Sequence, residues 1–125
     1  MAFGPSRTEG TPRAPVAELR EALQRVLAGD LAGAENALAT AARLDSSSID
    51  LYLALATVYR SRGAIGRAIQ IHQNLLLRRE LPAGLRREAL LGLAFDFRAG
   101  GFLRRAVASF RELLEHEPRN EDALR

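Results

Sequence analysis

The chain has 125 residues, enough for one domain or part of one, and 47% of them are hydrophobic, which excludes an intrinsically disordered protein. No apolar run approaches the roughly 18 residues that cross a bilayer, the first residues lack the apolar core of a signal peptide, and cysteine is absent, so we expect a cytoplasmic protein without disulfides or thiolate metal sites. The net charge is +3, but the charge is unevenly distributed, because the basic segment of residues 50–111 carries +7.

The first part of the chain predicts a tail and two helices. Residues 1–14 are rich in Gly, Pro, Ser and Thr and are expected to be disordered. A helix should begin near Pro15 and bury one apolar stripe, formed by Leu19, Leu23, Val26 and Leu27. After the break at Gly29, a second helix should turn six residues inward, namely Leu31, Ala34, Ala37, Leu38, Ala41 and Leu44.

Two further helices are predicted after the turn at residues 45–48, whose side-chain oxygens can cap a helix. The first covers about 49–62, ends at Gly63 and should bury Tyr52, Leu55, Ala56 and Tyr59. The next covers about 65–79 and should bury Ile65, Ala68, Ile69, His72 and either Leu75 or Leu76.

The last two predicted helices follow a connection at residues 81–84. One covers about 85–99 and should bury Leu90, Leu93, Ala94 and Phe97. The other follows Gly100 and Gly101, covers about 103–116 and should bury Leu103, Ala106, Val107, Phe110, Leu113 and Leu114. Residues from Pro118 onward resemble the opening of another helical unit, so we expect a fragment of a longer array with an exposed apolar end.

The predicted helices repeat. Residues 53–77 and 91–115 align at an offset of 38, which superimposes Ala56 on Ala94, Tyr59 on Phe97, Gly63 on Gly101 and Ala68 on Ala106. Gly29 and Ala34 precede Gly63 and Ala68 by 34 residues. A period in this range is typical of helical repeat arrays, which are extended binding surfaces. We expect repeats at about 15–47, 48–83 and 84–118, with a fourth beginning over 119–125.

These positions resemble the tetratricopeptide repeat. The likeness lies in an aromatic residue near the start of the first helix (Tyr52), a Leu-Ala pair, a second aromatic, a closing glycine, a small residue at the helix crossing and a terminal proline (Pro118). The resemblance implies an all-α fold, a right-handed α-solenoid of about three helix-turn-helix repeats. It also implies that the first helix of each repeat lines the concave side.

A narrower resemblance covers residues 59–63 and 67–73 and the longer connection at Leu81-Pro82. These segments are similar to the bacterial lipopolysaccharide assembly protein B family, which has a membrane anchor, a cytoplasmic repeat array and a rubredoxin-like metal domain. The resemblance implies an adaptor that regulates lipopolysaccharide assembly by bringing a protease to a deacetylase. The anchor and the metal-binding cysteines are not in this sequence, so an association with the inner membrane is expected only of a longer protein.

The resemblance places a partner-binding groove on the first helices. Its expected residues are Arg20, Gln24, Leu53, Thr57, Arg60, Leu91, Phe95 and Arg98. Arg20 and Gln24 belong to this set only if the first apolar stripe is shifted by one residue. Arg60 and Arg98 share one place in successive repeats, and Phe95 lies outside the core stripe of its helix. Guanidinium groups bind carboxylates in bidentate fashion, so we expect an acidic, partly apolar peptide or helix as the partner.

Catalytic and cofactor sites are not expected. His72 lies where the next repeat has Phe110, and we interpret it as a packed core histidine, because the pattern suggests no carboxylate or nucleophile partner for it. His72 and His116 are too far apart in sequence for a metal-ligand motif. No phosphate-binding loop or Ser-His-Asp pattern occurs. We therefore predict a binding protein rather than an enzyme, with no cofactor or metal.

Two other kinds of partner remain open. The basic segment 50–111 could bind anionic ligands or nucleic acid, although lysine is absent and few groove aromatics could stack on bases. A salt titration separates the hypotheses, because nucleic-acid binding weakens steeply with salt. The apolar C-terminal end also predicts self-association.

Overall fold

The structure, a computed structural model, describes residues 16–115. The predicted tail over 1–14, His116 and the predicted opening of a fourth repeat at 119–125 lie outside the described residues. The chain divides into two compact units, Met1–Leu55 and Ala56–Arg125, and each is described by itself below. The boundary between the units, at Leu55 and Ala56, lies within the third helix and does not coincide with a predicted repeat boundary. The repeat boundaries therefore remain a prediction.

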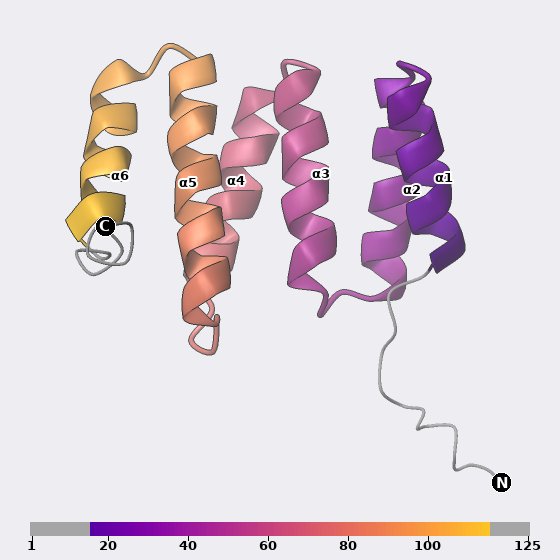
Figure 1. Ribbon diagram of the computed structural model, residues 1–125, viewed down its shortest axis with the longest axis horizontal. Coiled ribbons are helices and arrows are strands. Elements are labelled where there is room, and N and C mark those ends of the chain that lie inside the picture. Colours follow the sequence, from indigo (N-terminus) through magenta and orange to yellow (C-terminus); the bar gives the residue numbers. More distant parts are fainter. Residues whose placement is uncertain (1–15, 116–125) are drawn as a thin grey trace, which may run out of the picture. The chain divides into compact units, whose positions relative to one another are not determined.

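Six α-helices and no strand occur within residues 16–115, which confirms the all-α prediction (Figure 1). They are α1 (Val16–Leu27), α2 (Leu31–Leu44), α3 (Ile49–Ser61), α4 (Ile65–Leu76), α5 (Ala83–Ala99) and α6 (Leu103–Glu115). In the first unit α1 packs against α2, and in the second α5 packs against both α4 and α6. Within the first unit α1 and α2 run antiparallel, and within the second α5 and α6 do, as the helical repeat pattern predicts.

Three turns between paired helices have the same geometry. Gly29, Gly63 and Gly101 have φ angles of +80°, +85° and +83°, a region that favours glycine. At Gly63, the glycine N–H donates to the Arg60 carbonyl and the next N–H, from Ala64, donates to the Tyr59 carbonyl. The same two bonds occur at the other two glycines. This is the Schellman helix ending, and it confirms all three glycine stops.

The connection between α4 and α5 differs from its predicted bounds. The sequence predicts a helix to about residue 79, but α4 ends at Leu76. Arg86 accounts for the end, because its guanidinium donates to the carbonyls of Leu76 and Arg78 at 3.3 Å each and so satisfies acceptors that the helix leaves unpaired. Pro82 precedes the first turn of α5, which therefore begins at Ala83 rather than 85.

The core of the first unit comes mainly from α2. Four of the six residues predicted to turn inward are buried, Leu31 is half-buried and Leu44 is 65% exposed. The predicted apolar stripe of α1 is wrong, since Leu23, Val26 and Leu27 are exposed and Leu19 is only half-buried. Ala22 is buried instead. It precedes Ala56 by 34 residues, the offset of the glycine turns, so the packing register follows the turn rather than the leucines.

In the second unit, the core centres on α5. Leu93, Phe97 and Ala106 form a buried cluster with Ile69, Leu76 and Phe110 against it, and all four predicted core residues of α5 are buried. Two cation–π contacts repeat at the 38-residue offset: Arg67 over Tyr59 at 5.6 Å, and Arg105 over Phe97 at 5.8 Å. The half of α3 that belongs to this unit buries Ala56 and Val58, whereas Tyr59 is half-buried.

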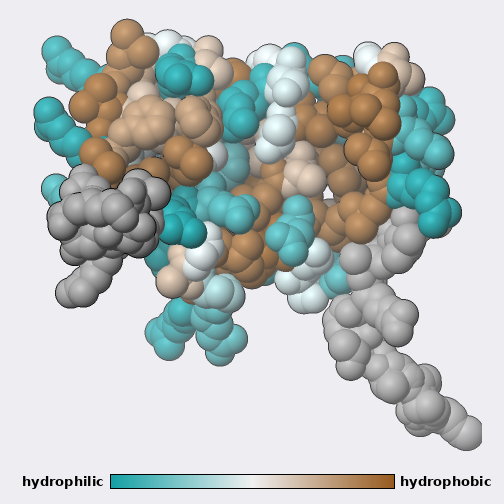
Figure 2. All heavy atoms as spheres, in the orientation of Figure 1, coloured by the Kyte–Doolittle hydropathy of each residue, from teal (hydrophilic) through white to brown (hydrophobic). Residues whose placement is uncertain are grey.

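The prediction for α6 is wrong at three residues. Ala106 is buried and Phe110 and Leu113 are half-buried, as the spacing predicts, but Leu103, Val107 and Leu114 are 62%, 49% and 65% exposed. Figure 2 shows hydrophobic surface over α5 and α6, edged by hydrophilic side chains. Within the described residues, only the side of α6 that packs against α5 is covered. The apolar residues of α6 extend beyond that side, so some of them remain exposed.

Candidate functional site

Two arginines flank one aromatic ring on the surface of the second unit. The Cζ atom of Arg98 lies 4.9 Å and that of Arg60 lies 5.7 Å from the centroid of the Phe95 ring. Both distances are within the range of cation–π attraction. The three side chains, with Ser61 and Ala99, line an open depression of about 480 Å³. We call these five residues the Arg–Phe surface.

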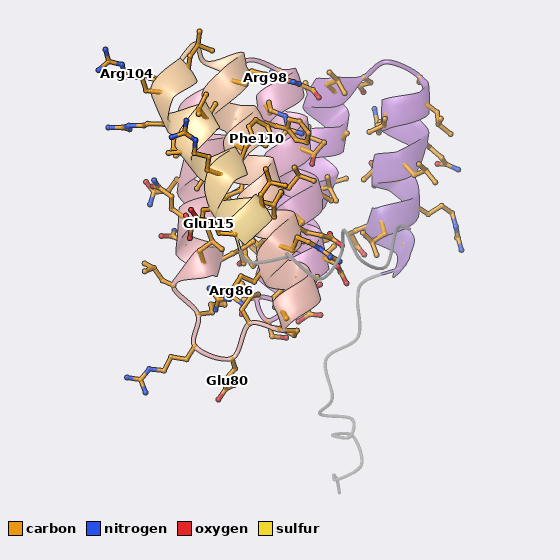
Figure 3. The ribbon with its side chains drawn as sticks, turned by 60° about the vertical axis from the view of Figure 1, so that its left-hand side comes forward. Glu80, Arg86, Arg98, Arg104, Phe110 and Glu115 are labelled. Atoms are coloured by element: carbon orange, nitrogen blue, oxygen red, sulfur yellow. The ribbon has the colours of Figure 1, made fainter. Side chains whose placement is uncertain are left out.

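Helical spacing explains how the Arg–Phe surface forms. Phe95 and Arg98 are three residues apart on α5, so they share a face of that helix. Phe95 packs against Phe110 of α6 in an edge-to-face arrangement, with the ring centroids 5.7 Å apart and the ring planes at 74° to each other. Figure 3 shows Arg98 near the C-terminal end of α5 and Phe110 on α6.

The predicted groove residues are partly brought together. The structure places Arg60, Phe95 and Arg98 side by side. Thr57 and Leu91 occupy the same helices as these three, the first exposed and the second half-buried. The other three predicted residues, Arg20, Gln24 and Leu53, belong to the first unit. The stripe shift that motivated Arg20 and Gln24 is absent, because Ala22 is buried, and no observation tests them as partner contacts.

A buried polar cluster lies beneath the Arg–Phe surface. Asp96 is fully buried, and its Oδ2 atom lies 2.5 Å from Nδ1 of His72, which is 2% exposed. The Oδ1 atom of Asp96 accepts a hydrogen bond from Nη1 of Arg60 at 2.8 Å, and the same nitrogen donates to the Gly92 carbonyl at 3.3 Å. A buried carboxylate needs such partners, because an isolated one is strongly disfavoured in an apolar interior.

The ring of His72 is enclosed by its neighbours. Its Nδ1 atom forms a hydrogen bond with Oδ2 of Asp96, and beside an ionised carboxylate, which only accepts hydrogen bonds, Nδ1 is the donor. The opposite edge of the ring packs on Gly92, where an added Cβ would come within 2.4 Å of Nε2. His72 is therefore enclosed on both sides, and it holds the Asp96 carboxylate in place rather than meeting a substrate.

Asp96 is a residue of the site that the sequence did not predict. The interpretation of His72 as a packed, hydrogen-bonded core residue agrees with its burial, but the expectation that it has no carboxylate partner is wrong. A signal was present in the repeat alignment. At the 38-residue offset Asp96 falls on Val58, which is buried, and His72 falls on Phe110. Two polar residues at places that are apolar in the other repeat indicate that the two pair with each other.

A larger cavity lies elsewhere in the second unit. It has a volume of about 880 Å³ and is bounded by the end of α4, the start of α5 and the C-terminal half of α6. Its apolar lining includes Leu76, Leu81, Leu90, Leu93 and Leu113, and Arg86, Arg87 and Glu112 also line it. Figure 3 shows Arg86 near the start of α5. None of the predicted partner-binding residues contributes to this cavity.

In the first unit, one arginine is held by acidic neighbours. Arg25 lies 2.8 Å from Asp30 and 3.3 Å from Glu21, and the hydrogen bonds and charges of these carboxylates raise the pKa of the guanidinium above its usual value. Asp30 also caps α2 by accepting from the Gly33 N–H at 2.9 Å. This cluster therefore joins the end of α1 to the start of α2.

The chain is similar to a bacterial protein over part of its length. It is 35% identical over 71 residues to lipopolysaccharide assembly protein B of Escherichia coli strain K12, and equally so to proteins of that name from the O6:H1 and O157:H7 strains. The matched segment is 57% of this chain and 18% of each relative, so the chain spans less than a fifth of their length. No family model matches the chain.

Two other features are absent from the part of the chain that the structure describes. Within residues 16–115, no helix is long and apolar enough to cross a membrane. In the same part of the chain, no group of three or more His, Cys, Asp or Glu side chains could hold a metal ion.

Proposed function

We propose that this chain is a protein-interaction module acting in lipopolysaccharide assembly, and that it binds a partner segment at the Arg–Phe surface. The observation that carries the proposal is its 35% identity to lipopolysaccharide assembly protein B over 71 residues. The all-helical architecture supports the role of adaptor, since helical arrays of this kind present binding surfaces. The similarity covers a small part of the relative, so the experiment must test the function in the chain itself.

The character of the Arg–Phe surface supports binding of a protein segment. Arginine and aromatic side chains are the commonest energetic centres of protein interfaces. Here both kinds are already in contact, and Phe110 limits the motion of the Phe95 ring. Little side-chain freedom remains to be lost on binding, which favours affinity.

The alternative is an anion or nucleic-acid site on the basic segment 50–111. Its +7 charge favours this reading. Several of its arginines are occupied, however: Arg60 by Asp96, Arg86 by backbone carbonyls and Arg67 by Tyr59. We therefore propose the protein-binding role and treat nucleic-acid binding as an outcome that the experiments below can reveal.

A site-specific cross-link tests the proposed function. A photoreactive amino acid replaces Ala99, which lines the depression, in cells that produce the chain and make lipopolysaccharide. The control carries it at Gln73, an exposed residue of α4 outside the Arg–Phe surface. We expect a protein of lipopolysaccharide synthesis to be captured at position 99 alone, and the amount of lipopolysaccharide to change when the chain is removed. Equal capture at both positions and unchanged lipopolysaccharide would contradict the proposal.

A further inference from the structure

We infer that the two arginines of the Arg–Phe surface have different roles: Arg98 takes the partner's carboxylate, while Arg60 is a positioning residue committed to Asp96. The inference rests on the proposed function and goes further, because it specifies the ligand. The site then fits a segment that carries one carboxylate beside an apolar side chain, rather than a polyanion.

The contacts of Arg60 hold it within the protein. Its Nη1 atom donates both to Asp96 and to the Gly92 carbonyl, and only 22% of its side chain is exposed. Asp96 is fully buried and carries the opposite charge. A partner carboxylate at Arg60 would have to compete with a carboxylate that is already in place and cannot move into water.

Arg98 is differently placed. It is exposed, its guanidinium lies over the Phe95 ring at 4.9 Å, and it forms no ion pair within residues 16–115. Stacking on Phe95 orients the planar guanidinium while its N–H edges remain available, which suits bidentate binding of a carboxylate. Within residues 16–115, Arg98 is therefore the arginine of the Arg–Phe surface whose charge is not matched by a carboxylate.

The charges and the lining together describe the ligand. Arg60 and Asp96 offset each other, so among the described residues the surface presents one uncompensated positive charge, that of Arg98. Phe95 and Ala99 provide apolar lining next to it. A Glu or Asp flanked by a leucine-type side chain matches both features, whereas a nucleic-acid strand needs several unmatched cations along its path.

A pair of capped tripeptides, Leu-Glu-Leu and Leu-Gln-Leu, tests this division by NMR titration of the intact chain. A charge-assisted hydrogen bond is stronger than a neutral one, so we expect the wild type to prefer the Glu peptide about tenfold. In Arg98→Ala this ratio should fall to about one. In Arg60→Lys, which keeps a cation opposite Asp96, the ratio should remain within about twofold of wild type.

A third variant separates charge from folding. Asp96→Asn keeps the shape of the side chain but removes the charge that matches Arg60, so we expect the preference for the Glu peptide to persist or rise. Thermal unfolding of each variant identifies changes that come from lost structure. Loss of the ratio in Arg60→Lys but not in Arg98→Ala would reverse the two roles and overturn the inference.

Two further outcomes would also overturn it. If neither peptide binds the wild type, the ligand is not of this class, while cross-linking at position 99 still decides the proposed function. The second outcome is that a single-stranded oligonucleotide binds more tightly than the Glu peptide. If its affinity also falls with salt as steeply as contacts to several phosphates require, and if Arg98→Ala abolishes its binding, the surface binds phosphates instead.

Discussion

Asp96 of α5 is a charged residue with no exposure to solvent. Its two oxygens are held by different helices, one by His72 of α4 and the other by Arg60 of α3. The three residues therefore tie α3, α4 and α5 together. Removing one partner from such a cluster leaves a buried charge with too few hydrogen bonds.

Arg60→Ala should lower the free energy of unfolding by about 3 kcal/mol, because among the described residues His72 would remain as the single side-chain partner of Asp96. Arg98→Ala is the matched control, since its side chain is exposed and it loses the cation–π contact with Phe95, so the same quantity should fall by no more than about 1 kcal/mol. Urea denaturation measures both. Equal effects of the two changes would show that Asp96 does not depend on Arg60.

Gly92→Ala should lower the unfolding free energy by about 1–3 kcal/mol. The new Cβ would lie 2.4 Å from Nε2 of His72, a ring that Asp96 holds in place. Gly66→Ala is the control, because that helical glycine has nothing within 4 Å of an added Cβ, so alanine there should stabilise by about 0.5–1 kcal/mol. A neutral result at position 92 would mean that His72 can move aside.

Among the secondary-structure elements, the turns were the most predictable from sequence. Gly29, Gly63 and Gly101 close helices with the same pair of hydrogen bonds, and a left-handed conformation is rare for other residues. The helix faces were less predictable. In α1 the leucine stripe and the glycine turn imply different registers, and the buried Ala22 shows that the turn prevails.

Small residues at helix crossings support a prediction for whole elements. Ala68 of α4 is fully buried and Ala106 of α6 is 4% exposed, as the repeat pattern indicates. Ala68→Leu and Ala106→Leu should each lower the unfolding free energy by about 1–3 kcal/mol through overpacking. Ala108 of α6 is exposed, so Ala108→Leu should change it by less than about 0.5 kcal/mol. Unchanged denaturant midpoints for both buried sites would place the crossings elsewhere.

For the molecule as a whole, the exposed apolar residues of α6 predict that the chain associates with itself in solution. Leu103 and Val107 are one helical turn apart and so share a face, and Leu114, seven residues beyond Val107, is also exposed. Contiguous apolar surface of this kind tends to find a partner. We expect the chain to associate with itself as its concentration rises, as measured by sedimentation velocity.

Val107→Glu should weaken this association without affecting the fold, because the side chain is already half exposed. Ala108→Glu places the same charge on the next residue of α6 and should weaken it less. A wild-type chain that stays monomeric at every concentration would contradict the prediction, and so would equal effects of the two substitutions.

The sequence by itself determined the helices, their order and the glycine turns, because these depend on local backbone preferences and on a period that recurs along the chain. It also indicated that Arg60 and Arg98 occupy equivalent places. The partner of each side chain was decided only by the tertiary structure. Equivalent places in a repeat have different neighbours, so Arg60 meets the buried Asp96 and Arg98 does not. The pairing joins residues that are 36 apart in sequence, one on α3 and the other on α5, and the local sequence around either residue does not indicate that contact.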